Sequence, residues 1–125
     1  MKAAHALSML DRQLRMNGED IVLKRLEPGS NPPAYRSVTC RATVRGMRPE
    51  EVIGTIKLTD VRVIISPTEI DRASWPGLST GKQADKPVPM INDKVIVKGR
   101  EMQVSFVDLI YVAGVWVRAN LIASG

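Results

Sequence analysis

Residues 92–125 read Asn92-Asp-Lys-Val-Ile-Val-Lys-Gly-Arg-Glu-Met-Gln-Val-Ser-Phe-Val-Asp-Leu-Ile-Tyr-Val-Ala-Gly-Val-Trp-Val-Arg-Ala-Asn-Leu-Ile-Ala-Ser-Gly125. Three runs rich in β-branched and aromatic residues, 94–98, 101–111 and 115–122, are separated by two short turns that contain glycine. This pattern predicts a three-stranded antiparallel meander. Strands joined by such short turns must be neighbours in space, so the rest of the chain has to assemble around this sheet.

Three further strands are predicted upstream, over 20–26, 35–45 and 55–66. The second alternates most cleanly: small apolar residues, including Cys40, point one way, and Arg and Thr residues point the other. Cys40 is therefore expected to be a small core hydrophobe rather than a nucleophile. In the third strand the apolar phase changes, which predicts a β-bulge or bend near Thr59-Asp60. A similar phase change predicts a second bend near Phe106.

Two helices and two loops complete the prediction. Residues 2–16 carry an apolar stripe at helical spacing, and Asn17-Gly18 ends that helix. Ser66-Pro67-Thr68-Glu69 predicts a second helix that opens with a capping box; Trp75-Pro76-Gly77 ends it. Residues 28–34 and 78–91 are rich in Pro and Gly, lack periodicity and predict exposed loops.

These elements predict a mainly β fold. We expect a small closed or partly open antiparallel β-barrel of about six strands, with an N-terminal helix and one short internal helix; a sandwich is the alternative. The length favours a single domain, 1–125. Within it, 1–17 forms the N-terminal helix, 19–66 and 93–124 form the barrel, and 67–92 forms the short helix and a long mobile loop.

Composition narrows the class of protein. Hydrophobic residues make up 44% of the chain, enough for a real core, and a single cysteine rules out an intramolecular disulfide. No apolar run approaches the roughly 18–20 residues that span a bilayer, and the first residues are too weakly apolar for a signal peptide. A soluble intracellular protein is expected. The net charge is +5, and the whole excess lies in residues 1–48. Such a basic half indicates contact with nucleic acid or with an acidic protein surface; a solvated basic face without a specific partner is the alternative.

Few groups are available for chemistry. The only histidine, His5, lies in the first turns of the N-terminal helix, far from Cys40 and from any strand serine. Cys and His are too few for a typical zinc site, and the glycines near Lys82 do not have phosphate-loop spacing. The carboxylates are scattered over loops and turns. We therefore expect no enzyme activity, no catalytic residues, no metal and no cofactor.

A nucleic-acid-binding barrel is a competing hypothesis. Barrels of the OB type stack bases on aromatic side chains across a basic face. The basic strand 35–45 carries only Tyr35, while Trp75 and Trp116 lie on other elements. Basic residues without interleaved aromatics weaken this alternative.

The order and spacing of five segments resemble the head–tail joining proteins of tailed bacteriophages and prophages, the head-closure or stopper class of head-completion protein. The segments are Gly18-Glu-Asp-Ile-Val-Leu-Lys-Arg25, Asp60-Val-Arg-Val-Ile-Ile-Ser66, Asp93-Lys-Val-Ile-Val-Lys-Gly99-Arg100, Val104-Ser-Phe-Val107 and Gly114-Val-Trp-Val-Arg-Ala-Asn-Leu121.

The resemblance implies a structural virion protein made in the bacterial host cytoplasm and located in the neck. It would assemble as a ring of about six or twelve copies, between portal or adaptor proteins and tail proteins, closing the DNA-filled head and offering a platform for the tail. Another neck ring, such as a tail terminator, is the alternative. The loops 28–34 and 78–91 would be ordered by neighbours. Candidate contacts to DNA, the channel or a neighbouring subunit are Lys82, Lys86, Arg41, Arg45 and Arg48.

Overall fold

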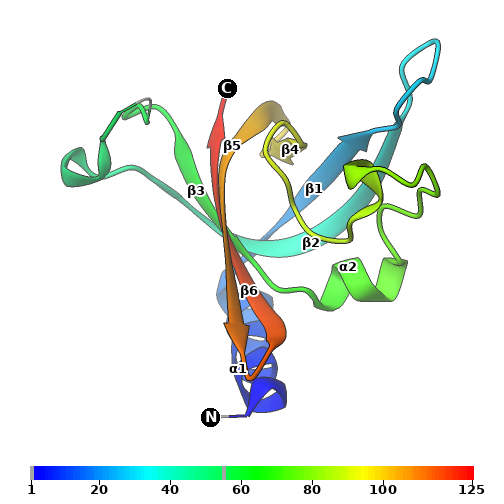
Figure 1. The fold of residues 1–125 in the computed structure, drawn as a ribbon. Coiled ribbons are helices and arrows are strands. Elements are labelled where there is room, and N and C mark those ends of the chain that lie inside the picture. The colour runs from blue at the N-terminus through cyan, green and yellow to red at the C-terminus, as the bar shows by residue number, and fades with distance from the viewer. Residues whose placement is uncertain (1, 55) are drawn as a thin grey trace.

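Six antiparallel strands close into a barrel (Figure 1). The computed structural model describes residues 2–54 and 56–125. The strands follow the order β1-β2-β3-β6-β5-β4, and pairing of β1 with β4 closes the sheet. The fold class predicted from the sequence is confirmed. The strands are β1 Glu19–Leu26, β2 Tyr35–Gly46, β3 Val61–Ile65, β4 Lys94–Val97, β5 Arg100–Val112 and β6 Val115–Ser124.

The C-terminal meander is also confirmed. β4 pairs with β5, and β5 pairs with β6 along nearly its whole length. The register slips by one residue between Val104 and Phe106, which is the bend predicted near Phe106, and again between Ile110 and Tyr111. Such bulges increase local twist, which a small sheet needs in order to close.

The prediction of a strand over 55–66 is wrong for the first half of that range. β3 begins only at Val61, and Thr55 lies outside the described residues. Residues 57–60 form a turn instead, because the backbone N–H of Lys57 donates to the Asp60 carboxylate at 2.9 Å and that of Asp60 donates to the Lys57 carbonyl at 3.0 Å. The apolar phase change therefore separates a turn from a strand, and there is no bulge at Thr59-Asp60.

The core fills the barrel with small and medium apolar side chains. Inward positions alternate along every strand, as with Ile21 and Leu23 on β1 and Val38, Cys40 and Ala42 on β2. Cys40 is fully buried, as expected of a core hydrophobe. On β1 the inward phase continues to Arg25, at the end of the barrel covered by residues 75–92.

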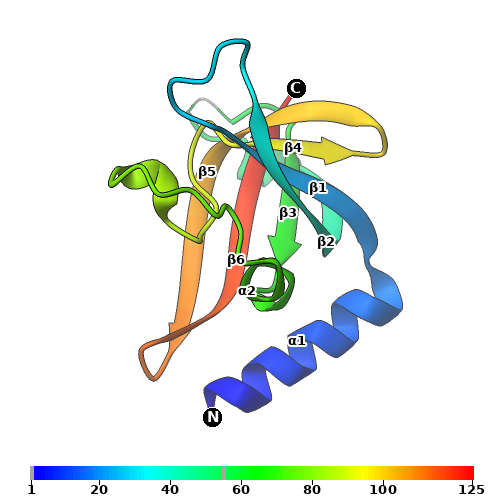
Figure 2. The ribbon, with the colours of Figure 1, turned by 90° about the vertical axis from the view of Figure 1, so that its right-hand side faces the viewer.

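Two α-helices lie outside the strands (Figure 2). α1 (Ala3–Asn17) crosses below the barrel near the β5–β6 hairpin, and α2 (Thr68–Ala73) lies beside it. The capping box predicted for α2 is wrong: Pro67 occupies the N-cap position without a side-chain cap. The Ser66 hydroxyl accepts from the Thr68 N–H at 3.3 Å, and Glu69 accepts from the Arg41 N–H at 3.3 Å instead of reaching back to the start of the helix. Short 3-10 turns cover Pro49–Glu51 and Gln83–Asp85.

Three connections extend away from the strands. The β1–β2 hairpin loop and the segment 75–92 lie at the right of Figure 1, and the β2–β3 connection projects to the left. None of the described helices is long and apolar enough to cross a membrane.

Candidate interaction surfaces

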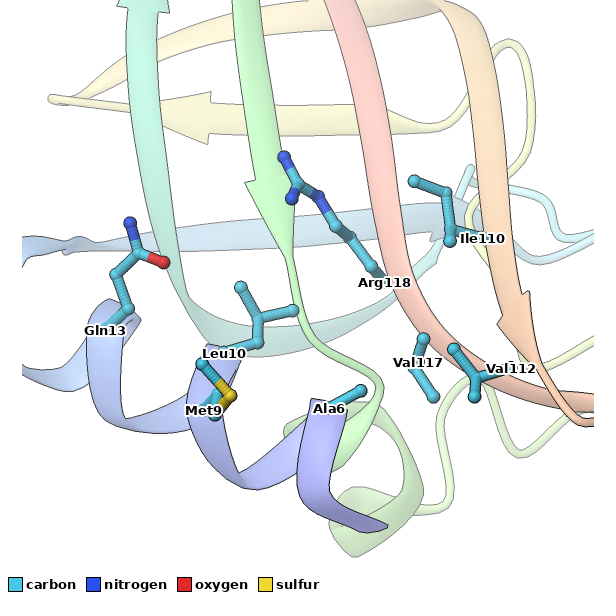
Figure 3. Close-up of a pocket in the computed structure, with 8 residues that line it drawn as sticks. All are labelled: Ala6, Met9, Leu10, Gln13, Ile110, Val112, Val117 and Arg118. Atoms are coloured by element: carbon cyan, nitrogen blue, oxygen red, sulfur yellow. The ribbon is translucent and has the colours of Figure 1, made fainter. Parts of the chain in front are cut away.

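An apolar groove lies between α1 and the β5–β6 hairpin (Figure 3). It has a volume of about 320 Å³, and α1 lines one wall while β5 and β6 line the other. We call it the α1 groove; its lining residues are Ala6, Met9, Leu10, Gln13, Ile110, Val112, Val117 and Arg118. The apolar members converge in Figure 3, and Gln13 and Arg118 add polar groups. An open apolar groove of this size is a place where another side chain can dock.

The groove stays open because α1 packs loosely. Leu14 is the one α1 residue that is fully buried, whereas Met9 is 55% and Met16 67% exposed. The predicted stripe of α1 therefore faces the barrel but is buried at only one position. An amphipathic helix gains most of its stability from burying its apolar face, so this helix has unused apolar surface to offer.

Arg41 is not a free surface cation; it fixes the C-terminal end of α1. Its guanidinium donates to the carbonyls of Leu14, Arg15 and Gly18, the last at 2.7 Å, and pairs with Asp20 at 3.3 Å. The Leu14 carbonyl also accepts from the Gly18 N–H at 2.8 Å, and a cation is favourable beside the carbonyls at the C-terminal end of a helix. Its predicted contact with DNA or a neighbour stays a prediction, but this side chain already has an internal role.

Arg45 belongs to a three-residue ionic network. It lies directly opposite Arg62 in the β2–β3 register, and Glu51 bridges the two. The Glu51 carboxylate accepts two hydrogen bonds from Arg45 at 2.8 Å each and lies 3.3 Å from Arg62. The hydrogen bonds from Arg45 and from the Arg48 backbone lower the pKa of Glu51 to about 2. Glu51 thus cancels the repulsion between two opposed arginines.

The remaining candidate cations, Arg48, Lys82 and Lys86, are exposed. Arg48 follows β2, while both lysines lie on the loop 78–91, so the structure does not gather the five candidates into one patch. Loop 78–91 has internal order as well: Asp85 accepts from the backbones of Thr80 and Gly81 and from the Thr80 hydroxyl, and these bonds lower the Asp85 pKa. Its proposed mobility stays a prediction.

A buried arginine anchors this loop, and the sequence analysis missed it. Arg25 is 4% exposed and donates five hydrogen bonds: two to the Asp93 carboxylate at 3.0 and 2.8 Å, and three to loop carbonyls. Those carbonyls belong to Ala84, Lys86 and Val88. The guanidinium also lies 4.4 Å from the centroid of the buried Trp75 ring. The sequence did contain a signal for this anchor. In the two-residue repeat of a strand, Arg25 falls on the same inward face as Ile21 and Leu23, and a charge on that face requires a partner.

The β2–β3 connection, residues 47–60, carries exposed apolar side chains. Val52 is 40%, Ile53 72% and Leu58 58% exposed, and Glu50 beside them is also exposed. We call this segment the β2–β3 loop. In Figure 1 it extends to the left, away from α1 and the β5–β6 hairpin. Three large exposed apolar side chains on one loop make this segment a candidate contact surface.

The groups that could do chemistry are separated. Burial, with a smaller effect of Glu69, raises the pKa of the Cys40 thiol to about 12, so the thiol stays protonated at neutral pH. His5 is exposed on α1. Within residues 2–54 and 56–125, no three His, Cys, Asp or Glu side chains are placed to hold a metal ion. The expected lack of enzyme activity stays a prediction.

Exposed aromatic side chains do not interleave with the basic strand. Tyr35 begins β2, and the Lys24 ammonium lies over its ring at 4.6 Å. Phe106 and Tyr111 are 49% and 55% exposed but lie on β5. The basic strand β2 therefore lacks the row of aromatic side chains on which the bases of a single-stranded nucleic acid would stack.

Comparison of the sequence with protein-family models gave no match, and comparison with curated proteins gave no match either.

Proposed function

We propose that this chain is a structural protein of the head–tail connector of a tailed bacteriophage or prophage. It acts as a ring that closes the DNA-filled head and provides the platform for tail attachment. The phage assignment rests on the sequence resemblance described above. The observation that carries a role in assembly is the unsatisfied apolar surface at two separate places, the α1 groove and the β2–β3 loop. A ring of more than two copies is held together by a heterologous contact, which needs two different surfaces on each copy.

The rest of the structure supports a scaffold. A closed barrel has no free sheet edge, so the strands resist unspecific pairing while loops and α1 make the contacts. The anchored loop 78–91 presents Lys82 and Lys86 outward, which suits an approach to DNA phosphates in a channel. Portal or adaptor proteins on one side and tail proteins on the other are the proposed partners, and the neck of the virion is the proposed location.

Affinity capture tests this proposal. The purified chain is immobilised and incubated with the portal-side and tail-side proteins of the phage or prophage that carries the gene for this chain. Retention of proteins from both sides supports head closure, and retention from the tail side alone supports the alternative of a tail terminator. Retention of neither contradicts a role in the neck.

A nucleic-acid-binding barrel remains the second candidate, favoured by the net charge of +5. It predicts tight association of the monomer with DNA that weakens steeply as salt rises. Fluorescence anisotropy with a labelled oligonucleotide at two salt concentrations measures this. The neck proposal expects weak binding by the isolated chain, since Arg41 and Arg45 are already engaged within the molecule.

A further inference from the structure

We propose that the second half of β5 binds an extended segment of another protein, which adds to the sheet as one more strand. The inference goes beyond the proposed ring and does not depend on it. The binding surface is the open side of residues 105–112, Ser-Phe-Val-Asp-Leu-Ile-Tyr-Val, which we call the β5 edge. The partner that fits it is an extended polypeptide with apolar side chains and one basic side chain.

The β5 edge has no strand partner on one side. β4 pairs with β5 only from Arg100 to Gln103, and the last main-chain bonds on that side join Val104 to Asn92 and Asp93 at 2.9 and 2.8 Å. Beyond them, β6 is the one strand that pairs with β5 in the described part of the chain. The barrel itself is closed, but this hairpin continues past it. In Figure 2 no strand or helix lies beside the lower half of β5 on the side away from β6.

Strand alternation shows which backbone groups face the open side. Val112 and Val115 flank a two-residue turn and form its closing hydrogen-bonded pair, so the backbone groups of Val112 face β6. Every second residue before Val112 therefore faces outward. These outward residues are Val107, Leu109 and Tyr111. No loop backbone among residues 2–54 and 56–125 bonds to them. A row of free N–H and C=O groups of this kind is what an added strand pairs with.

The β5 edge also lacks the features that normally prevent such pairing. Natural edge strands are protected by lysine, proline or a bulge. The β5 edge contains neither lysine nor proline, and it exposes Phe106 at 49% and Tyr111 at 55%. The register shift after Ile110 skips Val117 of β6, so β5 itself runs without interruption from Phe106 onward. An uninterrupted, apolar and unprotected edge is suited to a partner strand.

Asp108 favours a different protein over a second copy as that partner. Asp108 is exposed and forms no ion pair among residues 2–54 and 56–125. Two β5 edges paired with each other would place two Asp108 carboxylates on the same face of the pair. A strand with Lys or Arg opposite Asp108 instead gains a favourable cross-strand pair.

Hydrogen exchange followed by NMR, with a synthetic peptide, tests the proposal. The probe is acetylated and amidated Thr-Val-Thr-Lys-Thr-Val-Thr, and its control carries a methyl group on every backbone nitrogen. In the free chain, the amides of Val107, Leu109 and Tyr111 should exchange faster than those of Ile110 and Val112. At about 5 mM probe, exchange of the outward amides should slow about 5-fold, whereas the methylated control should have no effect. Outward amides that the probe leaves unchanged, or equal effects of the two peptides, overturn the proposal.

Two substitutions at one position separate the main chain from the side chain. Tyr111→Pro removes an outward N–H, and proline is tolerated where the N–H of an edge strand faces solvent. Tyr111→Thr keeps that N–H and removes the aromatic ring. The proline variant should bind the probe about 10-fold more weakly, and the threonine variant should bind it within about 3-fold of the parent chain. Equal losses would assign the binding to the tyrosine ring and overturn strand addition.

Charge provides a readout that leaves the backbone unchanged. Replacing the lysine of the probe by glutamate should weaken binding about 2–5-fold, and Asp108→Lys should reverse that preference. Sedimentation velocity gives the remaining outcome. Self-association that Tyr111→Pro abolishes and Tyr111→Thr keeps would show that a second copy occupies the β5 edge, which overturns the choice of partner. Failure of the strand-addition tests leaves the neck proposal standing, because that proposal rests on other surfaces.

Discussion

Replacing Arg25 by Met should cost about 3–5 kcal/mol of the free energy of unfolding. The change leaves the 5% exposed Asp93 carboxylate without its guanidinium, and removes a donor from each of three loop carbonyls. Breaking a buried ion pair by deleting one partner costs about 3–5 kcal/mol. A domain of this size has a total stability of about 5–15 kcal/mol, so the loss is a large fraction of it.

Equilibrium unfolding in urea measures the effect, and Arg36→Met is the matched control. Arg36 lies opposite Arg25 in the β1–β2 register, but it is exposed, and the one ion pair that it forms among residues 2–54 and 56–125, to Glu27 at 3.6 Å, is long. Its replacement should change the stability by less than about 1 kcal/mol. For a chain of 125 residues, the Arg25 variant should also melt about 10–20 °C lower. Equal stabilities of the two variants, within about 1 kcal/mol, would refute the assignment of Arg25 as the anchor of loop 78–91.

Three further predictions concern single side chains. Glu51 has a folded-state pKa lowered to about 2, so its stabilising effect is present above the ordinary value of 4.5 and is lost as the pH falls toward 2. The difference in melting temperature between the parent chain and Glu51→Gln should therefore be largest above about pH 5 and vanish near pH 2; a difference independent of pH contradicts this. The Cys40 thiol should react with a thiol reagent at pH 8 only as fast as the protein unfolds, because it is fully buried with a pKa of about 12; rapid labelling of folded protein would show that the site is open. Gly18→Ala should destabilise the fold by about 2–4 kcal/mol in chemical denaturation, since a Cβ there would lie 2.4 Å from the Leu14 carbonyl oxygen and 2.7 Å from that of Ala42. The control Gly46→Ala meets nothing within 4 Å and should be nearly neutral.

The barrel could be predicted because its strands carry local signals. Residues 92–125 contain two short turns and three β-rich runs, and short turns force neighbouring strands to pair. The alternation of Val38, Cys40 and Ala42 identified the inner face of β2 directly. The bend predicted from the phase change at Phe106 was correct because β5 continues through that position.

The bulge predicted from the change of apolar phase at Thr59-Asp60 was wrong. A turn and a β-bulge both move the apolar side chains from even-numbered to odd-numbered positions, so the sequence pattern is the same for both. Only the hydrogen bonds between Lys57 and Asp60 distinguish them, and those depend on how the Asp60 carboxylate is buried. The alternation of apolar residues alone therefore does not locate the start of β3.

The candidate cations show a second limit. Arg41 and Arg45 are on outward positions of β2, but the partners that engage them come from the end of α1 and from the turn at Pro49–Glu51. Such partners are set by tertiary packing, which a strand pattern does not encode. The exposed Ile53 and the open α1 groove were missed for the same reason, since exposure is a property of the assembled fold.

We propose that this chain works by assembling into a ring. Electron microscopy of the purified protein, alone and with the portal-side adaptor of a matched phage, tests it most directly. Closed rings of uniform diameter with a central opening are expected in at least one of the two samples. Separate single copies in both samples, at every concentration at which the protein stays dissolved, would contradict it.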